Sequence, residues 1–177
     1  MPLPSIHPAQ LLRIFSLAIA TLLPTMAFAE PSAIYLVRHG EKASIGHDPA
    51  LTPQGQLRAH NIATILHRSG IQAIFSTPTT RTLQTARPLA QQLGLKVERY
   101  EPAAPEALVE QVKALHGAVL VVGHSNTLPE LVRLFGGAPG SDIADDDYDR
   151  LYQLTPSPGG IVRTVVLTSL PASGGVP

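Results

Sequence analysis

The chain has 177 residues, no cysteine, and 13 Lys and Arg against 13 Asp and Glu. This length supports one domain with at most a short appendage, and the lack of cysteine excludes disulfides, thiolate metal sites and a cysteine nucleophile. The neutral charge without a basic stripe, and an aromatic fraction of only 5%, argue against nucleic-acid binding.

Residues 1–29 have the pattern of an export signal. Arg13 is their only basic residue, the apolar run IFSLAIATLLPTMAFA follows it, and AFA precedes Glu30 as a small-x-small cleavage pattern. The run is short and is interrupted by a proline, so a cleaved signal is favoured over an uncleaved membrane anchor. We therefore expect a signal peptide over 1–29, a mature domain over 30–177 that is periplasmic or secreted, and no stable membrane span after cleavage.

The first elements of the mature chain alternate in type. AIYLV at 33–37 predicts a strand buried on both faces. In the next segment Thr52 can cap a helix, Pro53 suits its first turn and Gly70 suits its end. IQAIFS at 71–76 predicts a second strand. The helix predicted between Thr52 and Gly70 has an apolar face formed by Ala59, Ile62, Ala63 and Leu66.

The alternation continues to the end of the chain. TPTTRTLQTARPLAQQLG predicts a helix that ends at Gly94 and that Pro88 could break. LKVERY predicts a weaker strand, a helix follows from about Glu106 to His116, and AVLVV at 118–122 predicts a fourth buried strand. GHSNT then leads into a helix through Phe135, and YDRLYQLT and GIVRTVVLT flank PSPGG as a predicted hairpin.

Repeated strand–helix–strand units predict a mainly parallel sheet with helices on both faces, a three-layer α/β/α sandwich. The final hairpin is expected to supply an antiparallel strand. In such sheets ligands bind beyond the carboxyl ends of the strands, which tells us where functional side chains should gather.

Candidate functional side chains follow each of the four predicted parallel strands. Arg38 and His39 follow the first, Arg81 lies in the first helical turn after the second, Glu101 follows the third, and His124 follows the fourth. Arginine binds phosphate oxygens bidentately, helix-start N–H groups add donors, and a neutral imidazole can attack phosphorus. Because arginine can neutralise the transition-state charge, this chemistry requires no metal or other cofactor.

Three segments together resemble the signature of the histidine phosphatase superfamily, the phosphoglycerate-mutase-like phosphatases. They are LVRHGEK, FSTPTTRTLQTA and VLVVGHSNT, and the similarity spans roughly residues 33 to 168. The resemblance implies that His39 is the nucleophile and forms a phosphohistidine. It also implies that Arg38 and Arg81 hold the phosphoryl group and that His124 hydrogen-bonds to it.

Each residue also has a structural interpretation. The Arg38–His39 pair could form a loop salt bridge with Glu41, His124 could be a satisfied strand-end histidine, and Arg81 could pair with a carboxylate on its helix. A metal held by the two histidines is less well supported, since no carboxylate has ligand spacing. The remaining histidines of the mature chain are expected to be solvated, namely His47, His60, His67 and His116.

A general acid is needed to release an alkyl alcohol. Glu101 is the first candidate and Glu106 the second, although Glu106 could simply occupy the first turn of a helix. In the family that the chain resembles, small members without an evident acid act on phosphohistidine.

The acidic run of 142–149, within SDIADDDYDR, is interpreted as a solvated loop. The alternatives are that it shapes the pocket mouth or binds a cation or sugar hydroxyls.

We therefore expect an exported phosphatase that hydrolyses small phosphomonoesters, with envelope sugar phosphates as candidate substrates. The alternatives are a phosphohistidine or phosphoprotein phosphatase that needs no acid, and a non-catalytic phosphoglycan-binding module. The sequence makes no prediction of oligomeric state.

Overall fold

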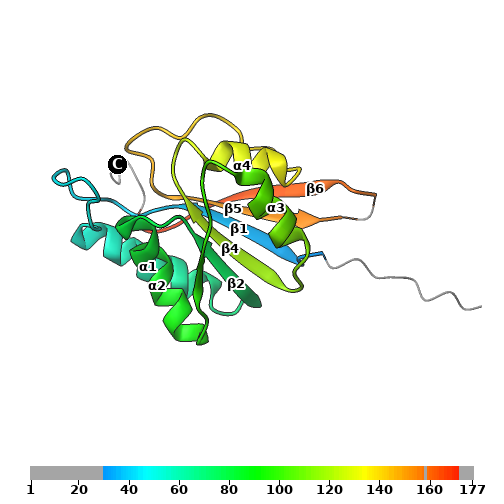
Figure 1. Ribbon diagram of the computed structural model, residues 1–177, viewed down its shortest axis with the longest axis horizontal. Helices are drawn as coiled ribbons and strands as arrows, with labels where there is room; N and C mark the ends of the chain where they lie inside the picture. The colour runs from blue at the N-terminus through cyan, green and yellow to red at the C-terminus, as the bar shows by residue number, and fades with distance from the viewer. Residues whose placement is uncertain (1–29, 158, 172–177) are drawn as a thin grey trace, which may run out of the picture.

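A computed structural model describes residues 30–157 and 159–171. The signal peptide predicted for residues 1–29 lies outside these residues. The strands and helices, shown in Figure 1, are β1 (Ala33–Arg38), α1 (Pro53–Leu66), β2 (Ile71–Ser76), α2 (Thr80–Leu93), β3 (Val97–Arg99), α3 (Pro105–Lys113), β4 (Ala118–Gly123), α4 (Leu128–Leu134), β5 (Arg150–Pro156) and β6 (Val162–Thr168).

The strands form one 6-stranded sheet in the order β3-β2-β4-β1-β5-β6. The pairs β1–β4, β2–β4 and β2–β3 are parallel. The hairpin β5–β6 adds antiparallel strands beside β1. The prediction of a mainly parallel sheet with an antiparallel addition is therefore confirmed.

Helices cover both faces of the sheet, with α1 and α2 on one side and α3 and α4 on the other (Figure 1). Because β1 and β4 are buried along their whole length, their side chains alternate between the two apolar cores. Leu36 and Val121 face the core under α3 and α4, whereas Val37 and Val122 face the core under α1 and α2. The fold is a three-layer α/β/α sandwich, as predicted.

The predicted helix signals work locally. The Thr52 hydroxyl accepts a hydrogen bond from the Gly55 N–H at 3.1 Å and so caps α1. Gly94 closes α2 in the left-handed conformation with φ +66°, which glycine adopts at little cost. Pro88 lies inside α2 without ending it, so the helix is continuous where a break was considered.

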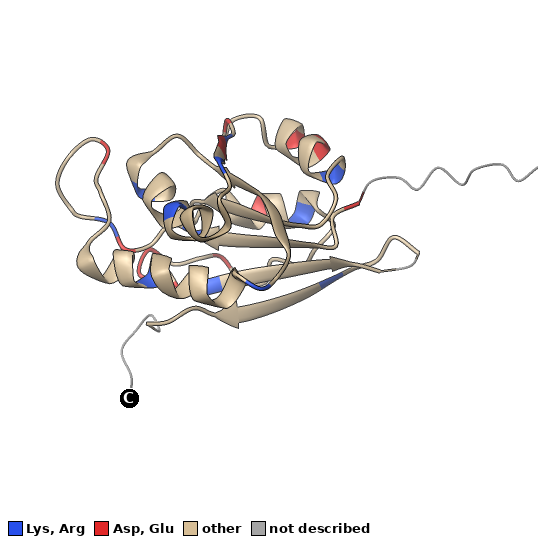
Figure 2. Ribbon diagram, turned by 90° about the horizontal axis from the view of Figure 1, so that it is seen from below, with Lys and Arg blue, Asp and Glu red and all other residues tan. Residues whose placement is uncertain are grey.

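Charged residues are interspersed over helices and loops, and no basic stripe runs along any element (Figure 2). Within residues 30–157 and 159–171, none of the helices has the length and hydropathy required to cross a bilayer.

Candidate active site

The carboxyl ends of three adjacent strands deliver the candidate residues to one place. β4 lies between β1 and β2 in the sheet. Arg38 is level with Gly123, and Ser76 is level with Val122. The residues just beyond these ends are His39, His124 and Thr77. The ring centroids of His39 and His124 are 5.4 Å apart, and the angle between the ring planes is 66°. Two residues far apart in sequence therefore share one site.

The backbone fixes the tautomer of His39. Its Nδ1 lies 2.8 Å from the carbonyl oxygen of Gly40. A carbonyl can only accept a hydrogen bond, so Nδ1 must carry the proton. The neutral ring therefore has its lone pair on Nε2. His39 is only 3% exposed, which holds this ring in one orientation.

Burial and positive charge keep both histidines neutral. Burial, together with His124, Arg38 and Arg81, lowers the pKa of His39 to about 3. Burial, with Arg81 and Arg38 adding to it, lowers the pKa of His124 to about 4. At neutral pH both rings are therefore unprotonated, and the positive charge of the site resides on the two arginines.

Arg81 and Thr77 orient His124. The Arg81 Nη2 lies 3.5 Å from Nδ1 of His124, and the Thr77 hydroxyl lies 2.9 Å from Nε2. Because a guanidinium only donates, Nδ1 accepts and Nε2 carries the proton. Arg81 also contacts Asp48 through Nη1 at 3.5 Å, and its Nε is buried without a partner in the described chain. Asp48 lies on the loop after β1, whereas the sequence suggested that Arg81 could pair with a carboxylate on its own helix.

Arg38 is held by the acidic loop, which we define as residues 141–149. Its Nη1 donates to the carbonyls of Ala144 at 2.7 Å and Asp147 at 2.8 Å, and its guanidinium carbon lies 4.0 Å from the centroid of the Tyr148 ring. The prediction of a purely solvated loop is therefore wrong for these residues. The prediction that the loop is solvated holds only for exposed side chains such as that of Asp146. The sequence shows the charges of the loop but not what its backbone contacts.

A buried ion pair supports the loop after β1. Arg58 of α1 is fully buried and contacts Glu41 at 2.6 Å. It also donates to the carbonyl of Ser169 at 2.9 Å. Glu41 is therefore committed to Arg58, and the salt bridge between Glu41 and Arg38 that the sequence allowed is not formed. The backbone of Gly55 packs directly against the backbones of Gly40 and Glu41, which leaves no room for a side chain at Gly40 or Gly55.

The two candidate acids form their described contacts away from the histidine rings, within their own turns. The Glu101 carboxylate accepts a hydrogen bond from the Ala103 N–H at 3.4 Å within its own turn. Glu106 is exposed in the first turn of α3. Neither forms a hydrogen bond, ion pair or ring contact with His39 or His124 in the described chain. No set of three or more His, Cys, Asp or Glu side chains among residues 30–157 and 159–171 could hold a metal ion.

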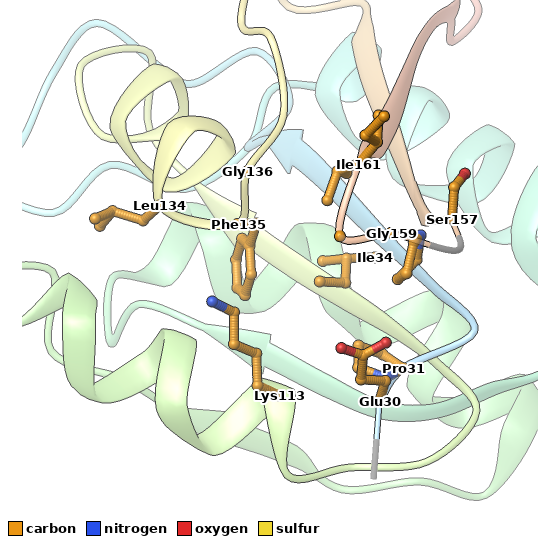
Figure 3. Close-up of a pocket in the computed structure, with 13 residues that line it drawn as sticks. Glu30, Pro31, Ile34, Lys113, Leu134, Phe135, Gly136, Ser157, Gly159 and Ile161 are labelled. Atoms are coloured by element: carbon orange, nitrogen blue, oxygen red, sulfur yellow. The ribbon is translucent and has the colours of Figure 1, made fainter. Parts of the chain in front are cut away.

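Two cavities lie near α4. An open cavity of about 780 Å³ is lined by Ser125 and Asn126, which directly follow His124 in sequence, and by Asp145, but not by Arg38, His39, Arg81 or His124. A second, of about 520 Å³, lies at the start of β1 and is lined by Ile34, Lys113, Phe135 and others (Figure 3).

Sequence reasoning missed Thr77, Tyr148, Asp48 and Arg58. Thr77 directly follows β2, just as His39 follows β1, so the same strand-end rule could have found it. Tyr148 lies next to the acidic run but has no motif of its own. Arg58 occurs in a helix among polar residues, and nothing local indicates that its partner is 17 residues earlier.

Comparisons with known proteins find similarities in sequence and in fold. Residues 34–102 match the family model of the histidine phosphatase superfamily, branch 1. The human protein 6-phosphofructo-2-kinase/fructose-2,6-bisphosphatase 4 is 35% identical over 78 residues, which are 40% of this chain and 16% of that protein. The match thus spans about a sixth of the length of this curated relative.

Solved structures show that the fold is shared. The protein histidine phosphatase SixA in complex with tungstate is 20% identical, with a TM-score of 0.59 over 77% of this chain and 96% of that one. Phosphoglycerate mutase from Bacillus anthracis is 14% identical, with a TM-score of 0.61 over 77% and 92% of the two chains. The chain therefore has a fold similar to phosphoglycerate-mutase-like structures.

Proposed function

We propose that this chain is a member of the histidine phosphatase superfamily that hydrolyses phosphomonoesters through a phosphohistidine on His39. The observation that carries the proposal is the bond between Nδ1 of His39 and the Gly40 carbonyl. It leaves the lone pair on Nε2, and the depressed pKa of about 3 keeps that nitrogen free of a proton. A binding module would have no use for such a nucleophile.

The reaction follows in two steps. Nε2 of His39 attacks phosphorus, the bond from phosphorus to the leaving oxygen breaks, and the leaving group takes a proton. Water then attacks the phosphohistidine and gives up a proton to solvent, the P–N bond breaks, phosphate is released, and neutral His39 is regenerated. The guanidinium groups of Arg38 and Arg81 stabilise the negative oxygens in both transition states, and His124 supplies a hydrogen bond.

The source of the leaving-group proton divides two classes of substrate. Neither Glu101 nor Glu106 contacts the histidines, and Asp48, which contacts Arg81, is held ionised because hydrogen bonds from Thr80 lower its pKa. An ionised carboxylate is a poor acid. This arrangement favours leaving groups that depart without help, such as a phenol or the imidazole of a phosphohistidine, over an alkyl alcohol.

The first experiment measures release of phosphate from phenyl phosphate and from an alkyl phosphate. We expect turnover of the phenyl ester, a decrease of about 10³-fold or more in His39→Ala, and little change in the matched control His60→Ala, whose exposed ring lies on α1. With ³²P-labelled substrate, an acid-labile and base-stable label should appear on the native protein only.

Other outcomes identify the alternatives. Equal turnover of the alkyl ester, lost in Glu101→Gln or Glu106→Gln, would restore that carboxylate as the general acid. Phosphate binding without turnover would identify a non-catalytic binding module.

We also propose that the protein is exported through residues 1–29. Detection of the tagged protein only in the cytosolic fraction would refute this.

A further inference from the structure

The strongest unassigned feature near the site is the contact between Arg38 and the acidic loop. Arg38 is 4% exposed. Both of its hydrogen-bond acceptors are backbone carbonyls of the loop, those of Ala144 and Asp147, and both are reached by Nη1. One nitrogen of the guanidinium is thus fully used by the loop, while the guanidinium carbon lies over the Tyr148 ring, 4.0 Å from its centroid.

These contacts determine which edge of Arg38 can meet a ligand. Nε is buried and has no hydrogen-bond partner, and Nη2 forms no hydrogen bond within residues 30–157 and 159–171. The two N–H groups along this edge are parallel and match two oxygens of a phosphoryl group. A buried donor without a partner is costly unless a ligand satisfies it, so we expect this unpartnered edge to meet the phosphoryl group.

Tyr148 also contacts the proposed nucleophile. Its ring centroid is 6.0 Å from that of His39, at an angle of 57°. The Tyr148 ring therefore lies beside both residues, and its shorter contact is the one with the guanidinium of Arg38. Cation–π attraction to Arg38 is strengthened here because the guanidinium is withdrawn from water.

The loop that carries Tyr148 is closed on itself by Arg150. Its Nε contacts Asp147 at 2.6 Å, and its Nη1 donates to the Ser141 carbonyl at 2.7 Å. Its Nη2 donates to the carbonyl of Asp142 at 3.2 Å. The two ends of the loop are thereby tied to the start of β5, which gives Tyr148 a fixed support.

We propose that Tyr148 is a positioning residue for phosphoryl transfer, because its ring holds the Nε–Nη2 edge of Arg38 toward the phosphoryl group beside His39. The inference rests on the proposed function. It predicts that the aromatic ring matters much more than the hydroxyl, and that the effect of Tyr148 is exerted through Arg38.

The test compares phenyl phosphate hydrolysis by Tyr148→Ala, Tyr148→Leu and Tyr148→Phe. We expect kcat to decrease about 10-fold in the Ala and Leu variants, with a smaller change in KM, and rescue to within about 3-fold by Phe. Leu keeps bulk without the aromatic face and guards against a folding defect in Ala. The matched control is Asp142→Ala, an exposed substitution in the same loop.

A double-mutant cycle separates positioning from a general loop defect. In an Arg38→Ala background, Tyr148→Ala should cause no further decrease in kcat. If the two decreases multiply, or if Phe loses as much activity as Ala, the proposal is wrong.

Failure of the proposed function would be recognised separately, as no turnover by the native protein. In that case the same variants are compared for binding of inorganic phosphate. Tyr148→Ala should then raise Kd about 10-fold and Tyr148→Phe should raise it by less than about 3-fold. Equal affinities would refute the positioning role.

Discussion

The environment of His39 predicts an acid-dependent loss of stability. Burial and the neighbouring His124, Arg38 and Arg81 lower the pKa of His39 from 6.5 to about 3 in the folded protein. In the unfolded chain the imidazole is hydrated and binds a proton below pH 6.5. The contribution to stability is therefore complete above pH 6.5 and is lost as the pH falls toward 3, because the unfolded state then binds more protons.

The magnitude at pH 5 follows from the unfolded chain alone. pH 5 lies about 1.5 pH units below 6.5, and at about 1.36 kcal/mol for each pH unit the folded state loses about 2 kcal/mol through His39. This figure does not depend on the folded-state pKa provided that it is well below 5. Glu41 and Asp48, whose folded-state pKa values are also lowered from 4.5 and 3.8, lose their contributions at lower pH.

Urea unfolding at pH 8 and pH 5 measures this loss. We compare the native protein with His39→Asn, whose amide can still donate to the Gly40 carbonyl but cannot titrate. The free energy of unfolding should decrease by about 2 kcal/mol less in His39→Asn than in the native protein. His60→Asn is the control for removing one histidine from the surface. Equal decreases in the native protein and His39→Asn would show that His39 takes up a proton freely in the folded state.

Two further predictions concern the contacts that hold the loop after β1 in place. Glu41→Ala should destabilise the protein by about 3–5 kcal/mol in urea unfolding because the buried Arg58 loses its counter-ion, whereas the double variant Glu41→Leu/Arg58→Met should lose much less. A large loss in the double variant as well would mean that packing, not charge, dominates. Gly55→Ala should reduce both stability, by about 1–3 kcal/mol, and phosphatase activity, since its methyl group would overlap the backbone of Glu41. Native-like kinetics in this variant would show that the loop after β1 can be displaced without loss of activity.

The fold was predictable because its signals are local and repeated. The buried runs that became β1 and β4, the cap at Thr52 and the stop at Gly94 each act within a few residues. Their alternation then restricts the topology, since crossover connections impose parallel pairing. β3 is shorter than the run LKVERY suggested because only Val97–Arg99 pair with β2, a tertiary property that the run itself does not contain.

The candidate site was predictable only in part. The strand-end rule correctly brings together His39, His124 and the two arginines, since it requires only the order of elements. It cannot identify Tyr148 or the carbonyls of Ala144 and Asp147, because these reach Arg38 through a folded loop more than 100 residues away. It also placed Glu101 at the rim without indicating that its carboxylate would bond within its own turn.

The different partners of the arginines explain how the site can be both buried and positively charged. Arg58 is neutralised by Glu41 and serves as support. Arg38 instead donates through Nη1 to two backbone carbonyls, which satisfy this nitrogen without forming an ion pair, and the charge of Arg38 reaches His39. If Arg38 were paired with a carboxylate, the local charge would be neutral, and His39 would be easier to protonate and a phosphoryl group less strongly held. Carbonyl acceptors on Arg38 would therefore serve two purposes in the proposed reaction: they help to keep His39 unprotonated, and they leave positive charge for a phosphoryl group.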